Sequence, residues 1–133
     1  MQPIQLFDLA SRQAEWLSVR QEVVAGNIAN ANTPKFRAKD VTPFQSVLEN
    51  QTIGMAKTNP AHFSGNDFGD TGTTGSIGVE EAPLTQEIGV QESGNTVGLE
   101  QELTKTGEIQ RQYSLNTALV SSFHRMMMMT VKP

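Results

Sequence analysis

Two histidines and one glycine-containing segment are the parts of this sequence whose residue types and spacing could support catalysis or ligand binding. His62 and His124 have no Cys and no second His nearby that would complete a metal shell. Residues 89–96 have the glycine spacing of a phosphate-binding loop, but Asn95 occupies the position of the lysine that reaches the phosphates in such a loop. We therefore predict no enzymatic activity, no metal and no cofactor.

The composition argues against nucleic acid and membrane as partners. The 133 residues carry a net charge of −4, include no Cys, and show no basic cluster that would attract nucleic acid or anionic lipid. No apolar run approaches the roughly 20 residues that span a bilayer, so we expect no direct membrane insertion. Residues 1–5 lack a basic region followed by an apolar core, so we expect no cleavable signal peptide. The protein then either stays in the cytoplasm or leaves by a route that reads no such signal.

A helix is predicted from about Ile4 to Ala31. Apolar and small side chains recur there at alternating spacings of three and four, which is the heptad pattern of a helix packed lengthwise on another helix. Pro34 disfavours the helical conformation of Thr33, so the helix should end at or shortly before Thr33. The predicted seam consists of Phe7, Ala10, Ala14, Leu17, Gln21, Val24, Ile28 and Ala31.

A second heptad-patterned helix is predicted to follow Gly98, which serves as its N-cap, and to run to Met129 or Thr130. Glu100 and Glu102 lie in its first turn, where the helix dipole favours negative charge. The methionines at 126–129 cover every face of the last turn, as core filler or as an adaptable surface between subunits. Its predicted seam consists of Ile109, Tyr113, Asn116, Val120, Phe123 and Met127.

These patterns predict a mainly α fold in which the two long terminal helices pair as a coiled-coil-like hairpin. Three regions are expected: residues 1–34, the loop-rich middle 35–94, and residues 95–133. Within the middle we expect an extended segment at 35–44, a short helical piece at 44–50 and a turn at 58–63. Residues 64–94 are predicted to be a flexible, Gly-rich loop, because they offer few apolar side chains to offset the entropy of ordering.

Residues 25–34 carry the most specific string, Ala-Gly-Asn-Ile-Ala-Asn-Ala-Asn-Thr-Pro. It resembles the N-terminal signature of the flagellar rod and hook proteins, which polymerise into the axial structure of the bacterial flagellum. The passages at 33–44 and 58–62 are similar to the corresponding elements of the FlgB family of proximal rod proteins. The passage at 95–102 resembles the start of the final helix in the axial proteins as a whole. Lys35 stands where that family commonly has Gly, and Gly98 stands where it usually has Asp.

The resemblance implies a structural subunit of the proximal rod that polymerises through its terminal helices and transmits torque. It implies export by the flagellar type III apparatus without signal cleavage, and a location in the rod of the basal body, which crosses the periplasm. The implied partners are further copies, the rod proteins FlgC, FlgF and FlgG, the protein FliE, the MS ring and the export gate. The residues assigned to assembly are Phe7, Ala10, Ala14, Leu17, Val24, Asn27, Ile28, Asn30, Ala31, Asn32, Thr33, Pro34, Ile109, Tyr113, Val120, Phe123 and Met127.

Two further interpretations depend on the same resemblance. Phe44 and Leu48 fit the Phe-x-x-x-apolar pattern with which rod and hook substrates dock on the export gate, although a short amphipathic helix packed on the terminal helices would show the same spacing. Asn27 and Asn30 share a helix face, so we expect their amides to fix the register of neighbouring subunits. The alternatives are another short rod subunit of the FlgC type and a cytoplasmic two-helix secretion chaperone or binding module.

Overall fold

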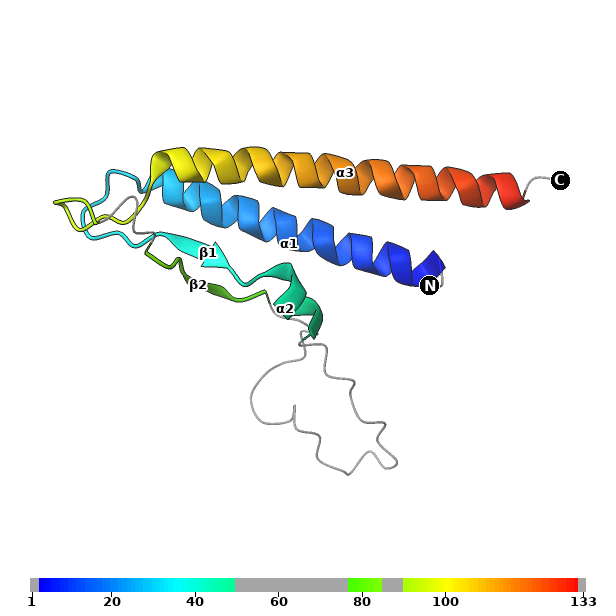
Figure 1. The fold of residues 1–133 in the computed structure, drawn as a ribbon, viewed down its shortest axis with the longest axis horizontal. Coiled ribbons are helices and arrows are strands. Elements are labelled where there is room, and N and C mark those ends of the chain that lie inside the picture. Colours follow the sequence, from blue (N-terminus) through cyan, green and yellow to red (C-terminus); the bar gives the residue numbers. More distant parts are fainter. Residues whose placement is uncertain (1–2, 50–76, 85–89, 132–133) are drawn as a thin grey trace, which may run out of the picture.

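The computed structural model describes residues 3–49, 77–84 and 90–131 of the chain (Figure 1). The predicted turn at 58–63 and the predicted loop residues 64–76 and 85–89 lie outside this part. None of the described helices has a stretch long and apolar enough to cross a membrane. In chain order the elements are α1 (Pro3–Ala29), β1 (Lys39–Val41), α2 (Phe44–Glu49), β2 (Val79–Glu81) and α3 (Leu99–Val131).

The helices α1 and α3 lie side by side and antiparallel, so both chain ends point the same way (Figure 1). The rings of Phe7 and Phe123 meet edge to face with their centroids 5.7 Å apart. Nearer the middle, the side-chain amide of Asn116 donates to the carbonyl of Ala10 at 2.9 Å. The mainly α fold and the predicted pairing of the terminal helices are thereby confirmed.

The helix ends follow the local signals in the sequence. α1 stops at Ala29, a few residues before Pro34, and Thr33 donates its amide to Asn30 in the turn that follows. α2 starts directly after Pro43, whose carbonyl accepts from Val47 at 3.2 Å. α3 begins after Gly98, whose carbonyl accepts from Glu102 at 3.0 Å. The predicted C-terminal limit is one or two residues short, because α3 reaches Val131.

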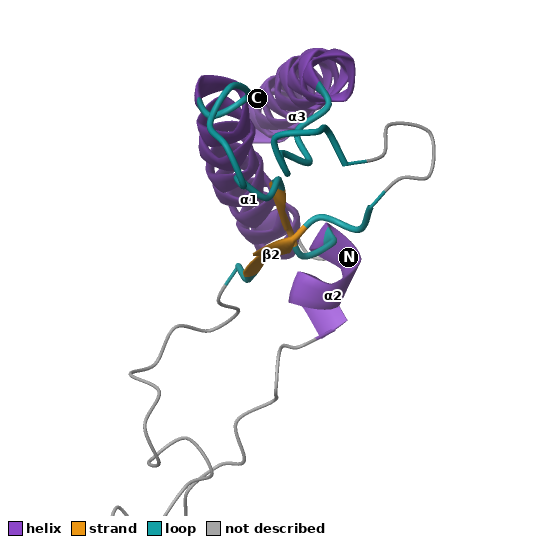
Figure 2. Cartoon of the chain, turned by 90° about the vertical axis from the view of Figure 1, so that its left-hand side faces the viewer, coloured by secondary structure: helices purple, strands orange, loops and turns teal. Residues whose placement is uncertain are grey.

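A small second layer covers another side of α1, as the end-on view in Figure 2 shows. β1 pairs antiparallel with β2, with Lys39 opposite Glu81 and Val41 opposite Val79. β2 lies inside the segment predicted to be a loop, so that prediction is wrong for residues 79–81. All three of its side chains are exposed, so the sequence lacks the alternation of apolar and polar residues that indicates a strand. Backbone hydrogen bonds to β1 hold the strand in place.

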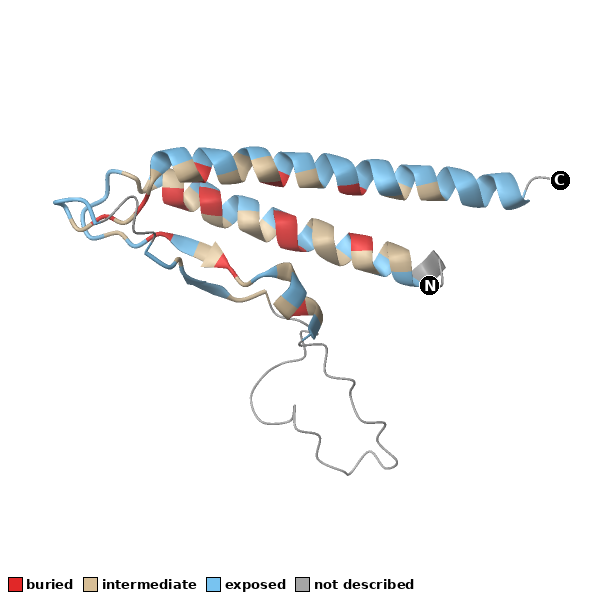
Figure 3. Ribbon diagram, in the orientation of Figure 1, coloured by how far each residue is buried: buried red, intermediate tan, exposed pale blue. Residues whose placement is uncertain are grey.

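The core lies where α1 meets both neighbours, and most of α3 stays exposed (Figure 3). Trp16 points to the second layer, where its indole donates to the carbonyl of Thr42 at 2.8 Å. Gln21, predicted as a seam residue, is exposed, because a polar side chain at the edge of the seam gains nothing from burial. The central cluster consists of Trp16, Leu17, Val24, Val41, Val47 and Ile109.

Candidate assembly site

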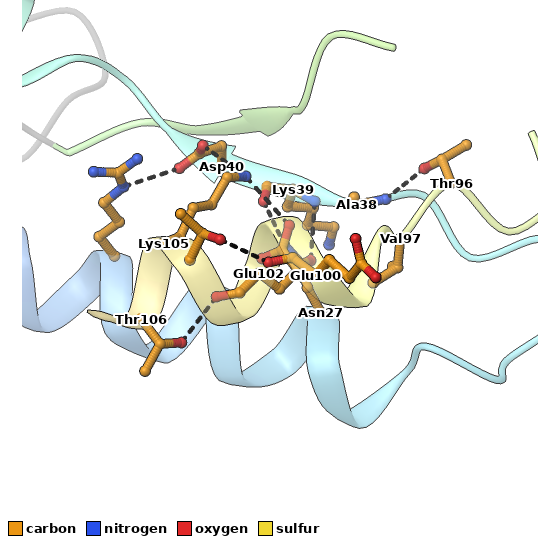
Figure 4. A network of polar contacts seen from close by, with 12 residues as sticks. Asn27, Ala38, Lys39, Asp40, Thr96, Val97, Glu100, Glu102, Lys105 and Thr106 are labelled. Carbon is orange, nitrogen blue, oxygen red and sulfur yellow. Dashed lines mark hydrogen bonds and ion pairs between the residues drawn. The ribbon is translucent and has the colours of Figure 1, made fainter. Parts of the chain in front are cut away.

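The signature asparagine Asn27 is 1% exposed and binds two other segments of the same chain (Figure 4). Its Nδ2 donates to the carbonyl of Lys39 at 2.7 Å, and its Oδ1 accepts from the amide of Lys39 at 3.0 Å. The same Nδ2 donates to Oε2 of Glu102, on α3, at 3.1 Å. One side chain thus fixes α1 against the start of β1 and against the first turn of α3.

Glu102 is 2% exposed although it is ionisable, and a row of alternating charges surrounds it. Lys105 lies 3.2 Å from Oε1 of Glu102 and 3.1 Å from Oδ2 of Asp40. Asp40 in turn lies 3.5 Å from Nε of Arg20, whose guanidinium stands 5.3 Å from the ring centre of Trp16. Since a buried charge is stable only when it is paired, Glu102 depends on Lys105, which also pairs with the partly exposed Asp40.

Asn95 is fully buried and binds the turn that follows α1. Its Nδ2 lies 2.9 Å from each of three carbonyl oxygens, those of Asn30, Ala31 and Thr33. Its Oδ1 accepts from the amide of Val97 at 2.7 Å. The side chain of Asn95, just before α3, therefore binds the carbonyls of the turn that follows α1.

The turn after α1 places Lys35 at a φ of 60°, in the left-handed region where side chains are unfavourable. Its amide donates to the carbonyl of Ser93 at 2.9 Å, and the neighbouring Gly94 has a φ of 79°. A Cβ on Gly94 would lie 3.5 Å from the Cα of Lys35, so the two turns lie against each other. Position 35, where the rod proteins commonly have glycine, thus has a backbone conformation that glycine adopts without strain.

The structure brings most of the predicted assembly residues into the contact of α1 with α3, not onto a free surface. Leu17, Val24, Ile109 and Asn27 are buried inside the subunit, where no neighbour reaches them in this conformation. Half-buried are Phe7, Ala14, Ile28, Val120 and Phe123 in the helices and Asn30 and Ala31 in the turn after α1, and Ala10 is buried. Exposed are Asn32, Thr33, Pro34, Tyr113 and Met127.

Asn30 also has its partners within the chain. Its Nδ2 donates to the carbonyl of Gly26 at 2.8 Å, and its Oδ1 accepts from the hydroxyl of Thr33 at 3.1 Å. The expectation that a neighbouring subunit supplies the partners of Asn27 and Asn30 therefore has no support in the hydrogen bonds of the folded chain.

The candidate export segment packs on α1. The ring of Phe44 lies 5.8 Å from that of Trp16, Val47 is buried in the core, and Leu48 is half-buried. The folded chain thus shows the short packed helix that the sequence left open.

Sequence reasoning missed Trp16, Asp40 and the buried role of Glu102. Trp16 is the only tryptophan and lies outside the heptad seam, which signals a second buried face. Glu102 carried a misleading signal, because a first-turn glutamate is normally a solvent-exposed partner of the helix dipole. Within the described residues, no three His, Cys, Asp or Glu side chains gather as metal ligands would.

The amino-acid sequence is similar to those of known flagellar proteins. Residues 16–37 match the family described as flagella basal body rod protein. The chain is 66% identical, over 99% of its length and 96% of the relative, to the flagellar basal body rod protein FlgB of Agrobacterium fabrum. It is 30% identical to FlgB of Borrelia hermsii over 94% of each chain, and 32% identical to FlgB of Bacillus subtilis over 71% of this chain and 68% of the relative.

Proposed function

The chain belongs to the FlgB family of flagellar basal-body rod proteins, and from this membership we propose how its helices build the rod. It is a structural subunit of the proximal rod. The hairpin of α1 and α3 is the unit that polymerises, and its exposed faces meet neighbouring subunits. Packed side by side, such hairpins form a continuous shaft that transmits torque.

The observation that carries this proposal is the apolar surface of α3. Large apolar side chains point to solvent in three stretches of α3, at 99–103, 113–119 and 126–131, and extensive exposed apolar surface on a monomer marks an interaction site. Several faces of the helix are affected, so more than one neighbour is needed to cover them. The exposed side chains are Leu99, Leu103, Tyr113, Leu115, Leu119, Met126, Met127, Met128, Met129 and Val131.

Assembly then completes a fold that is only partly stabilised in the single chain. The second layer contacts mainly α1 and reaches α3 through the ion pair of Asp40 with Lys105. The C-terminal half of α3 meets α1 through Asn116 and Phe123 and is otherwise mostly exposed. Any partner that binds only the folded form stabilises it by mass action, so helix order and polymerisation are linked.

The partners and the export route follow from membership in the rod family, and we propose them on that ground. The neighbours are further copies and the rod proteins FlgC, FlgF and FlgG, with FliE and the MS ring at the base. The chain reaches the rod through the type III export gate without signal cleavage and lies where the rod crosses the periplasm. Phe44 and Leu48 bind the export gate while the chain is unfolded.

Variants of α2 separate recognition by the gate from packing in the fold. We expect Phe44→Ala with Leu48→Ala to lower secretion while the cytoplasmic level of the chain is maintained. The matched control is Val47→Ala, which removes a buried side chain of the same helix outside the motif. An equal loss of secretion in the control would assign the effect to packing.

The proposed role itself is tested by mass spectrometry of purified basal bodies. A rod subunit co-purifies with the basal body in an amount similar to the other proximal rod proteins. Recovery in the cytosol alone would contradict the role and would favour a secretion chaperone.

A further inference from the structure

The outer edge of α1, on the side turned away from α3, carries a row of acidic side chains. Asp8, Glu15 and Glu22 are spaced seven residues apart, and all three are exposed. Each precedes by two positions a residue buried toward α3, namely Ala10, Leu17 or Val24. Two positions correspond to about 200° of rotation, so the acidic row points away from the hairpin contact.

The outer edge of α3 carries basic side chains with related spacing. Arg111 and Arg125 are fourteen residues apart and exposed. Each follows by two positions a residue directed at α1, namely Ile109 or Phe123. Arg111 and Arg125 therefore point to the other side of the hairpin, about 200° from the contact with α1.

Neither row has an ionic partner within the described part of the chain. Between the two arginines the edge of α3 offers small residues, Ser114, Ala118 and Ser122, which allow another helix to approach closely. Opposite charges on the two edges of one hairpin are complementary between copies that lie side by side in the same orientation. Rows of this kind beside a helix contact set register and orientation more than they add affinity.

We propose that the acidic edge of α1 in one copy of this chain lies against the basic edge of α3 in the next copy. This inference rests on the proposed role as a rod subunit and names one contact of that role. The two helices meet antiparallel, as α1 and α3 do within one subunit. Asp8 and Glu22 are separated by the same fourteen residues as Arg111 and Arg125, so Asp8 faces Arg125 when Glu22 faces Arg111.

This register differs slightly from the one inside the subunit, where Phe7 lies against Phe123. Relative to that pair, the pairing of Asp8 with Arg125 shifts the next copy along the axis by roughly 5 Å, at 1.5 Å per residue. The contact joins two different edges, so it is heterologous, and a heterologous contact with an axial shift generates an open helical array. In the same register Glu15 faces Ala118.

Disulfide cross-linking tests the contact directly, because the natural chain contains no Cys. The variant Glu15→Cys with Ala118→Cys, oxidised in assembled basal bodies, is expected to give a ladder of dimers, trimers and longer species that disappears on reduction. The two positions lie on opposite outer edges of one subunit, so a bond between them joins two copies. Each single-Cys variant is the matched control and is expected to stay monomeric.

Charge reversal provides the second arm. Arg111→Glu with Arg125→Glu is expected to lose swimming, and Asp8→Arg with Glu22→Arg is expected to do the same. The chain with all four changes regains swimming, because each pair is restored with its signs exchanged.

The inference is overturned if the double-Cys chain is recovered in basal bodies without a ladder, if a single-Cys chain dimerises, or if the fourfold variant swims no better than either double variant. In those cases the role as a rod subunit still stands. Absence of the natural chain from basal bodies would instead overturn that role, and this contact with it.

Discussion

The two ends of the α1–α3 hairpin are built in different ways. At the end where α1 stops and α3 begins, polar side chains join three segments through buried hydrogen bonds and ion pairs, with Asn27, Asn95 and Glu102 at their centre. At the opposite end the helices touch through Phe7 and Phe123, and the methionines of the last turns of α3 point to solvent. The first end specifies how one chain folds, and we propose that neighbouring subunits complete the second.

This difference indicates that the rod signature at residues 25–34 acts inside the subunit. Buried polar groups must find specific partners, so they select one register of the helices more sharply than apolar contacts do. Because Asn27 and Asn30 meet this need inside the subunit, we propose that the signature sets the register of the hairpin. Contacts between subunits then depend on the exposed edges and on the apolar surface of α3.

The largest expected effect comes from Asn95→Asp. The side chain keeps its shape, but a carboxylate replaces the amide that donates to three carbonyl oxygens. The donor is lost, and the buried negative charge is repelled by those oxygens. We expect the polar end to lose on the order of 3 kcal/mol of stability, measured by urea denaturation in an osmolyte that favours the folded state. Asn32→Asp is the control in the same turn, since Asn32 is exposed, and an equal loss there would contradict the role of Asn95.

Glu102→Gln should have the next largest effect. Among the described residues it leaves Lys105 with Asp40 as its one acidic partner, and it removes the charge that accepts from Asn27, so we expect a loss of about 2 kcal/mol. Glu100→Gln changes an exposed glutamate in the same helical turn and should stay within about 0.5 kcal/mol. Equal stability of the two variants would mean that the buried charges do not hold the hairpin.

Lys35→Gly should raise stability. Glycine removes the steric cost of a φ of 60°, which amounts to about 1 kcal/mol for a side chain in the left-handed region. Lys35→Ala is the control, because it removes the same charge and keeps the Cβ. If both variants gain equally, the charge and not the backbone conformation limits this turn.

The smallest expected effect on the isolated chain is that of Leu119→Gln, at the open end. Leu119 is 53% exposed, so we expect a change in stability within about 0.5 kcal/mol. Assembly should nevertheless fail, which is read out as loss of swimming while secretion continues. Normal swimming would show that this face of α3 contacts no neighbour.

The sequence predicts the two helices well, because heptad spacing and the prolines at 34 and 43 act locally. It places Leu17, Val24 and Ile109 in the contact for the same reason. The second layer is harder to predict. The side chains of β2 are all exposed and show no apolar alternation, and its partner strand β1 is distant in the sequence. The contact of Asn27 with Glu102 cannot be predicted in this way, because residue 102 is distant in the chain and helical spacing does not reveal which distant carboxylate a buried amide meets.

Hydrogen exchange along α3 tests the contrast between the two ends most directly. In the isolated chain we expect slow exchange of backbone amides at residues 102–109, next to the polar network, and nearly unprotected exchange at residues 117–129. In assembled rods both stretches should become protected. Equal protection of the two stretches in the isolated chain, or protection of residues 117–129 alone, would contradict the account.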